Sequence, residues 1–201
     1  MFISTYNNKG LNDVLMIMFK KADSSDQLME KKGDVTVIKE KSTGEVVGIN
    51  LFNASTYLKE LTDGPQILSE ADRGALNQLL KEHQFDVELK NQGGSKFVVG
   101  FVKSCEPVEG SDHLNLTQTE VEDGKTLQIV CGAGNIAEGQ KVVVAKTGAV
   151  LPDGLVIWPG ELKGVKSEGM ICSARELGLP QEKAGIMVLS DEVETGSAYK
   201  F

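Results

Sequence analysis

Short apolar runs separated by turn residues characterise the C-terminal half of the chain. Runs rich in valine and isoleucine lie at Leu127–Cys131, Lys141–Ala145 and Leu155–Trp158. Gly or Pro interrupts the chain between them at about the 8–12-residue spacing that is typical of small β-barrels and sandwiches. Asp153–Gly154 is a tight-turn signal, because Gly adopts a positive φ without steric cost. This pattern predicts a small β-barrel.

Other segments of this half extend the prediction. Phe97–Ser104 is expected to open the barrel as a strand, and Asp123–Gly124 is expected to turn the chain in a hairpin. Gly185–Leu189 is expected to form a late strand. Ser173, followed three residues later by Glu176, has the spacing of a capping box and predicts a short helix.

The N-terminal half combines strand patterns with a helix pattern. The polar segment Lys20–Lys32 predicts a loop or a frayed helical turn. Ser69 is a good N-cap, and Asp72 follows three residues later. Helical spacing then puts Ala75, Leu76, Leu79, Leu80 and His83 on one face. Strands are predicted at Met1–Tyr6, Val14–Phe19, Val35–Lys39, Val46–Phe52 and Phe85–Leu89.

A composition change marks a boundary between the halves. In Asn91–Ser95, two adjacent glycines stand between polar residues, which is typical of a short flexible linker. We therefore expect an α+β domain at residues 1–90, a linker at 91–95 and a β domain at 96–201.

Four segments of the C-terminal half resemble one known family at a single register. They read IVCGAGN (Ile129–Asn135), EGQKVVVAKTGAVLP (Glu138–Pro152), ELKGVKSEGMICSARELGL (Glu161–Leu179) and GIMVL (Gly185–Leu189). The region Phe97–Leu189 is similar to the tRNA-binding OB domain of the bacterial phenylalanyl-tRNA synthetase beta subunit, of some methionyl-tRNA synthetases and of small stand-alone tRNA-binding proteins. With its N-terminal half included, the chain resembles the YtpR-type tRNA-binding proteins of Gram-positive bacteria.

The resemblance implies a fold class and a function. The fold would be mostly β, with a small N-terminal α+β domain followed by a five-stranded OB-fold β-barrel. The function would be non-catalytic tRNA binding, in which the OB domain recognises the RNA by shape and backbone. Stand-alone relatives are dimers, and whether this chain forms a homodimer is left open.

The resemblance also marks candidate RNA-binding residues. Ser167 and Met170 match the family's Ser-x-Gly-Met element, which lies on the RNA-facing side in the relatives. Lys163 precedes that element, while Lys141 and Lys146 stand at the two ends of one predicted strand. As a set on one barrel face, these lysines would track a phosphate backbone. Singly, each also fits a solvated surface residue, and Met170 also fits a core side chain.

Two more candidates lie in predicted loops. Asn135 ends the Cys-Gly-Ala-Gly-Asn loop, where it would contact RNA or cap the turn that follows. His113 falls where the family's pattern, His-Pro-x-Ala-Asp-Lys-Leu, has a cation. Here Val108–Leu114 keeps Asp112 and Leu114 but lacks the His-Pro pair. Asp112 also fits a turn residue that accepts backbone hydrogen bonds.

The net charge of −8 restricts how RNA would bind. Residues 96–201 hold ten basic residues against fifteen acidic ones. Broad RNA-binding surfaces are usually basic, so a local lysine patch would have to supply the affinity. The acidic charge also suits the alternative of a protein-interaction or chaperone-like module of the CsaA type, whose OB domain this one also resembles.

No motif for catalysis or metal binding is present in the sequence. There is no Gly-x-Ser-x-Gly, phosphate loop or pair of histidine ligands, so we expect no enzyme activity, cofactor, metal or small-molecule substrate. No apolar run approaches the roughly 18 residues of a membrane span. Cys105, Cys131 and Cys172 are odd in number and widely spaced, which favours free thiols and a cytoplasmic location.

Overall fold

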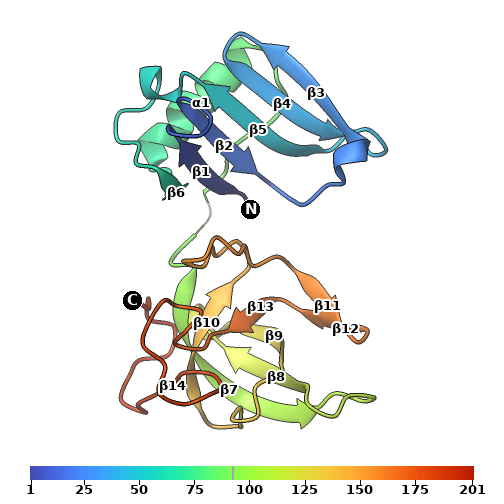
Figure 1. The fold of residues 1–201 in the computed structure, drawn as a ribbon, viewed down its shortest axis with the longest axis vertical. Coiled ribbons are helices and arrows are strands. Elements are labelled where there is room, and N and C mark those ends of the chain that lie inside the picture. The colour runs from blue at the N-terminus through green and yellow to red at the C-terminus, as the bar shows by residue number, and fades with distance from the viewer. Residues whose placement is uncertain (92) are drawn as a thin grey trace. The chain divides into compact units, whose positions relative to one another are not determined.

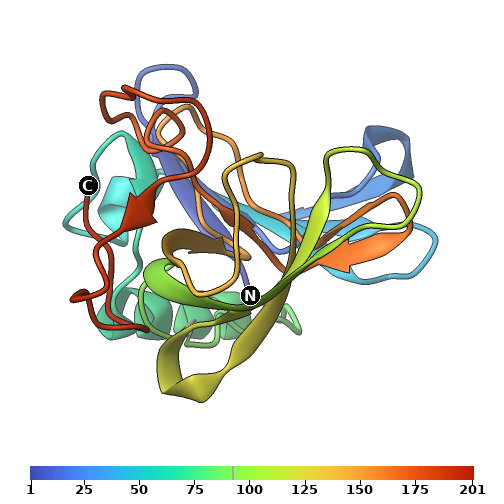
Figure 2. The same cartoon turned by 90° about the horizontal axis from the view of Figure 1, so that it is seen from below.

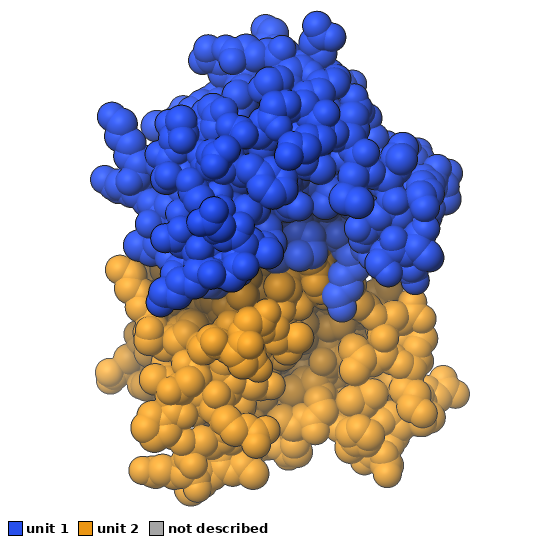
Figure 3. Space-filling view, turned by 45° about the horizontal axis from the view of Figure 1, so that its top comes forward, with its two compact units in different colours: residues 1–93 blue, residues 94–201 orange. Residues whose placement is uncertain are grey.

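The chain divides into two compact units, which Figure 3 colours separately. The computed structural model describes residues 1–91 and 93–201. Unit 1 runs from Met1 to Gly93 and unit 2 from Gly94 to Phe201. The predicted linker, Asn91–Ser95, includes Gln92, which lies outside the described residues. None of the described helices is long and apolar enough to cross a membrane.

Unit 1 is a six-stranded antiparallel sheet with helix α1 lying across one face (Figures 1 and 2). The strand order is β3-β4-β5-β2-β1-β6. Single 3₁₀ turns occur at Ser24–Asp26 and Ala54–Thr56. The remaining elements are β1 (Ile3–Asn7), β2 (Val14–Met18), β3 (Gln27–Lys32), β4 (Val35–Glu40), β5 (Val46–Phe52), β6 (Gly64–Gln66) and α1 (Glu70–Glu82). The predictions of β1, β2, β4, β5 and α1 are confirmed.

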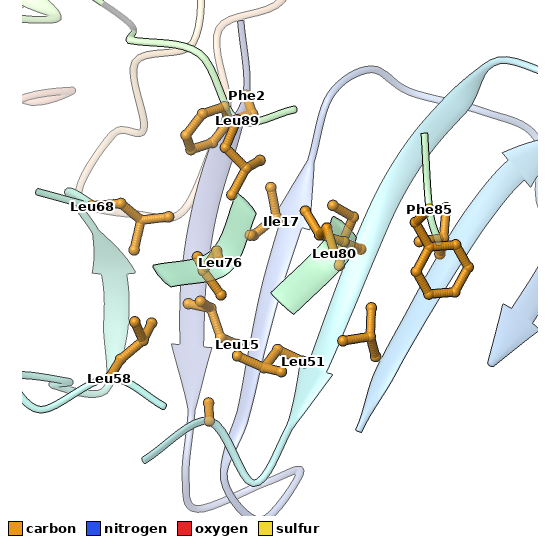
Figure 4. Close-up of a cluster of buried hydrophobic side chains, with 14 of the residues drawn as sticks. Phe2, Leu15, Ile17, Leu51, Leu58, Leu68, Leu76, Leu80, Phe85 and Leu89 are labelled. Carbon is orange, nitrogen blue, oxygen red and sulfur yellow. The ribbon is translucent and has the colours of Figure 1, made fainter. Parts of the chain in front are cut away.

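The core of unit 1 lies between the sheet and the helix. Side chains alternate across a strand, so Leu15 and Ile17 of β2 and Leu51 of β5 point to the same face. They pack against Leu76 and Leu80 of α1 (Figure 4). Full burial of such a side chain contributes about 1.5–3 kcal/mol. This layer of leucine and isoleucine therefore holds the helix on the sheet.

Helix α1 starts at the predicted N-cap, Ser69, which forms a capping box with Asp72. The Asp72 N–H donates to Ser69 Oγ at 3.1 Å, and the Ser69 N–H donates to Asp72 Oδ2 at 2.9 Å. Both N–H groups would otherwise be unpaired at the helix start.

Two predictions for unit 1 are wrong. Lys20–Lys32 includes the helical turn Ser24–Asp26, but its second half is β3, an edge strand whose largely exposed residues hide the apolar alternation of a strand. Phe85–Leu89 forms no strand. The Asn77 amide of α1 accepts from the Leu89 N–H at 2.7 Å and donates to the Leu89 carbonyl at 3.2 Å. The helix thus supplies the bonds that a neighbouring strand would have made.

Unit 2 is built on a five-stranded antiparallel sheet ordered β13-β10-β7-β8-β9 (Figure 1). Strand β14 also pairs with β10, and β11 pairs with β12 in a separate hairpin. The strands are β7 (Phe97–Pro107), β8 (Asn115–Glu120), β9 (Thr126–Cys131), β10 (Lys141–Lys146), β11 (Gly160–Leu162), β12 (Val165–Ser167), β13 (Gly169–Ile171) and β14 (Val188–Leu189). A 3₁₀ turn, Glu122–Gly124, joins β8 to β9.

The long strand β7 serves both halves of this sheet. Its first part pairs with β10 and its second part with β8, and the register shifts between Val102 and Ser104. At Gly100, an added Cβ would lie 2.5 Å from Val144 Cγ2 and 2.7 Å from Thr119 Cγ2. Glycine is therefore required where β8 and β10 both crowd against the bending strand.

The inward side chains of unit 2 fill a central core. Val98, Ile129, Val142 and Val144 meet there from three strands, β7, β9 and β10. The predicted fold class is confirmed: the chain is mostly β, with an α+β N-terminal unit followed by an OB-like β unit. The barrel is not fully closed, because among the described residues β9 and β13 form no main-chain ladder with each other.

Two predictions for unit 2 are wrong. Leu155–Trp158 contains no regular strand. It forms an isolated bridge between Val150 and Val156, flanked by main-chain hydrogen bonds of Leu155 and Ile157 to the segment 148–151. The capping bond from the Ser173 N–H to Glu176 Oε2 does form, at 2.7 Å. The chain after it makes turns and no helix, since Gly178 with φ +71° redirects it within one turn.

We expect Asn77→Ala to destabilise unit 1. The substitution leaves the N–H and carbonyl of Leu89 without partners, which should lower the free energy of unfolding by about 1–3 kcal/mol. Gln78→Ala, at the exposed neighbouring position, should change it by less than about 0.5 kcal/mol. Urea unfolding followed by the helical circular dichroism signal measures both. Equal effects of the two substitutions would contradict the role given to Asn77.

We also expect the fragment 94–201 to fold alone, because unit 2 has its own hydrophobic core. Limited proteolysis of the whole chain should cut within Asn91–Ser95, where two glycines stand between polar residues. The fragment should show a β-type spectrum and a cooperative thermal transition. A fragment that lacks the transition would show that unit 2 needs unit 1 to fold.

Candidate nucleic-acid interface

Strands β8 and β9 carry two cross-strand pairs on the face that lies opposite the core. Leu116 lies opposite Val130 and Gln118 lies opposite Gln128. Because Ile129 of β9 points into the core, these alternate residues point outward. The hairpin β11–β12 lies beside β9, and Gln128 Nε2 donates to the Lys166 carbonyl at 2.9 Å. We call these four side chains, the hairpin β11–β12 and the loop Val108–Leu114 the outer face.

The hairpin displays two lysines. Lys163 and Gly164 have φ of +51° and +79°, which is the backbone of a two-residue type I′ turn. The turn places Lys163 at the tip, and Lys166 follows on β12; both are exposed. Neither lysine forms an ion pair with any residue of the described parts of the chain. Both charges therefore point to solvent.

The loop Val108–Leu114 borders the same surface and carries His113. Val108 and Leu114 are buried against Val130 of β9, and Val165 of the hairpin packs on this cluster. Figures 1 and 2 show the loop and the hairpin on the same side of unit 2. The exposed His113 ring has Nδ1 at 2.6 Å from Asp112 Oδ1, and this hydrogen bond lowers the pKa of Asp112. His113 and Lys163 thus flank one apolar cluster.

The two predicted lysines of β10 are engaged inside the fold. Lys141 Nζ donates to the carbonyl oxygens of Asp191 and Val193, and so ties the C-terminal segment to the sheet. Lys146 Nζ pairs with the Glu122 carboxylate, and its side chain is 18% exposed. Burial lowers the pKa of the neighbouring Lys96, and the charge on Lys146 adds to that effect.

Ser167 is buried between β9 and β13. Its Oγ accepts from the Val130 N–H and donates to the Gly169 carbonyl, each at 3.1 Å. The hydroxyl therefore replaces part of the main-chain pairing that β9 and β13 lack.

Asn135 clamps a distant loop. Its amide accepts from the Ile186 N–H at 2.9 Å and donates to the Ile186 carbonyl at 3.0 Å. Gly185 has φ +111°, and a Cβ there would lie 2.1 Å from Asn135 Oδ1. Asn135 thus holds the segment before β14 in place.

Met170 lines a groove of about 600 Å³ in unit 2. Cys131–Ala133, β13, the turn after Ser173 and the segment Gln181–Ile186 form its walls. The exposed Arg175 and Lys183 also line it, and sequence reasoning did not identify either of them. A signal was present for one of them, since Arg175 is the sole arginine of residues 96–201.

The described residues offer no other obvious chemistry. No group of three or more His, Cys, Asp or Glu among them could hold a metal ion. Cys105, Cys131 and Cys172 are free thiols, as predicted. Burial raises the pKa of Cys172 to about 12, so this thiol is not an activated nucleophile.

Comparison with known families matches each half of the chain to a separate model. The model described as "Putative tRNA binding domain" matches residues 97–198, which lie within unit 2. A second model, described as a domain of unknown function (DUF4479), matches residues 22–92.

Two curated relatives show how the similarity is distributed. "Putative tRNA-binding protein YtpR" of Bacillus subtilis is 46% identical over 198 residues, 98% of each chain. The phenylalanine–tRNA ligase beta subunit of Halalkalibacterium halodurans is 49% identical over 113 residues, which are 53% of this chain and 14% of that subunit. Similarity to the first relative therefore spans both units. Among solved structures, the MetRS related protein from Pyrococcus horikoshii aligns over 52% of this chain and 88% of that chain, with 22% identity and a TM-score of 0.40.

The pair between Lys146 and Glu122 should make the stability of unit 2 pH-dependent. Burial alone would raise the pKa of Glu122, but the hydrogen bond from Lys146 and a backbone bond hold it below its ordinary value. A lowered pKa means that the carboxylate stabilises the fold above about pH 4.3 and that this stabilisation is lost as the pH falls further.

Glu122→Gln should therefore lower the free energy of unfolding of unit 2 at pH 7 by about 1 kcal/mol. This is less than the loss expected on breaking a fully buried ion pair, because the Glu122 side chain is 32% exposed. The difference from wild type should shrink at pH 3. Urea unfolding at both pH values measures it, with Glu161→Gln on the exposed hairpin as the control. A difference that is the same at both pH values would contradict the ion pair.

Proposed function

Because the chain belongs to the tRNA-binding family matched above, we propose that it binds tRNA through unit 2 and catalyses no reaction. The observation that carries the proposal is the match of the tRNA-binding family model to residues 97–198, which coincides with the OB-like unit. The full-length similarity to a relative named as a tRNA-binding protein supports it.

The outer face supplies the contacts in this proposal. Lys163 and Lys166 stand exposed on the hairpin, and His113 stands exposed on the loop across the same apolar cluster. Cations on a projecting hairpin reach phosphates of an RNA backbone, while Gln118 and Gln128 between them offer amide groups to ribose hydroxyls. Contacts of this kind fix position and shape and carry little base-sequence information.

The other predicted residues support this surface from within. Lys141 holds the C-terminal segment, and Lys146 holds the turn between β8 and β9. Ser167 fills the gap between β9 and β13, and Asn135 holds one wall of the groove. In this proposal they position the RNA-binding surface, and Met170 touches RNA from the groove.

The proposed binding is local and weak. The chain carries a net charge of −8, so the field of the whole molecule does not attract RNA from a distance. A few phosphate contacts on one hairpin give affinities on the order of micromolar or poorer at physiological salt. We place this binding in the cytoplasm, where tRNA is used.

Lys163→Asn should weaken tRNA binding and flatten its salt dependence. Asn suits the left-handed position of a type I′ turn, so the hairpin keeps its shape and loses one charge. The slope of log K against log salt should fall by about 0.7–0.9, which corresponds to one phosphate contact. A filter-binding titration of bulk tRNA at several salt concentrations measures it.

Lys59→Asn is the matched control, because Lys59 is an exposed lysine of unit 1 and its loss should leave the slope unchanged. Wild type that binds no tRNA at low salt, where screening is weakest, refutes the proposed function and leaves the protein-interaction alternative. An unchanged slope for Lys163→Asn refutes the assignment of Lys163 alone.

A further inference from the structure

The groove lies where the barrel of unit 2 fails to close. Strands β9 and β13 lie near each other in Figure 1. At one end β12 fills the space between them: Gln128 of β9 bonds to the Lys166 carbonyl, and the Ser167 hydroxyl bonds to Val130 of β9 and to Gly169 of β13. Past these bridges the two strands have no ladder between them, and the space opens into the groove of about 600 Å³. That volume is within the range of about 300–1,000 Å³ that is typical of small-ligand sites.

The far wall of the groove is fixed before any ligand arrives. The Asn135 amide holds both backbone groups of Ile186. Gln181 Nε2 donates to the carbonyl oxygens of Lys183 and Gly185, at 2.8 and 3.2 Å, while its Oε1 accepts from the Arg175 N–H at 3.1 Å. Two side-chain amides thus brace this segment, so that binding would not have to order it.

The groove combines apolar walls with charges of both signs. Met170, Ile171 and Ile186 supply apolar surface, and Arg175 and Lys183 supply cations. Of its carboxylates, Glu176 accepts both the N–H and the O–H of Ser173, at 2.7 and 2.6 Å. Glu182 stands beside Lys183. Neither Arg175 nor Lys183 forms an ion pair with a carboxylate of the described residues.

A nucleotide satisfies this mixed set with one molecule. Its phosphate takes cations, its base has a flat apolar face, and its amino and imino groups donate to carboxylates. An acidic or a basic peptide side chain would match charges of one sign and leave the other sign unpartnered.

The groove also adjoins the outer face. Gly132 lines the groove, and a Cβ added there would lie 3.7 Å from His113 Cδ2. An RNA backbone held at the hairpin and at His113 would therefore pass the mouth of the groove.

We propose that the groove takes one unstacked nucleotide from a single-stranded part of the bound RNA, with its base on Met170 and Ile171 and its phosphate at Arg175 and Lys183. This inference rests on the proposed function and adds a preference for RNA that has unstacked, single-stranded nucleotides. Duplex RNA keeps its bases stacked and cannot fill the groove, whereas loops and ends of tRNA can.

The test compares bulk tRNA with a blunt RNA duplex that has no single-stranded nucleotides, in salt titrations of the full chain. Arg175→Gln removes an exposed charge and leaves the backbone bond to Gln181 intact. It should weaken tRNA binding about fivefold and lower its salt slope by about 0.7, and it should leave duplex binding within about twofold. Met170→Ala should weaken tRNA binding about tenfold with the slope unchanged.

Met29→Ala, at an exposed methionine of unit 1, and Lys59→Asn are the matched controls. A circular dichroism melt checks the fold of Met170→Ala, and Arg175→Gln decides the question if that variant is unstable. Unchanged tRNA binding by Arg175→Gln, while Lys163→Asn still weakens it, overturns the groove assignment and leaves the proposed function standing. Equal losses on tRNA and duplex overturn the selection of an unstacked nucleotide. Failure of wild type to bind any RNA overturns both.

Discussion

The close packing of β8 and β10 against β7 at Gly100 is the constraint on which unit 2 depends. One strand pairs with β10 at its start and with β8 at its end, so both halves of the sheet share one core. A side chain at Gly100 would collide with Val144 of β10 and Thr119 of β8. The loop after β7 packs against the hairpin β11–β12, so that Leu114 and Val165 meet in one cluster. The outer face is therefore built from strands, a hairpin and a loop together, and no single one of them forms it.

Apolar runs and alternation predicted most of the longer strands with a buried face, because burial is what these patterns record. They did not predict the short strand β13, although its Ile171 is buried. The pattern missed β3, whose edge position leaves Leu28 and Met29 exposed. It also wrongly predicted a strand at Phe85–Leu89. The side chains of Phe85 and Leu89 are buried there, but the backbone of Leu89 bonds to the Asn77 side chain and not to another strand. The candidate site shows the same limit. The sequence positions of Lys141 and Lys146 do not show that their Nζ atoms bind partners within the same unit, the Asp191 carbonyl and the Glu122 carboxylate.

Two acidic residues of unit 2 pair with neighbouring lysines, so these charges are neutralised locally. Lys103 pairs with Glu120 at 2.5 Å, and Lys146 pairs with Glu122. These charges cancel at short range and contribute little beyond about 8–10 Å at physiological salt. The hairpin lysines project away from such pairs. What an approaching phosphate meets first is thus set by the geometry of a two-residue turn, more than by the sum of charges over the chain.

The contact between Asn135 and Gly185 also limits how this protein can evolve. The two positions are fifty residues apart in sequence, yet any side chain at Gly185 would overlap the Asn135 amide and would also need a left-handed backbone. A change at Gly185 is therefore harmful while Asn135 is present, and a change at Asn135 alone leaves the backbone of Ile186 unpaired. A single substitution at either position should therefore destabilise the protein. Related proteins should keep both residues, or replace both together when the loop itself is rearranged.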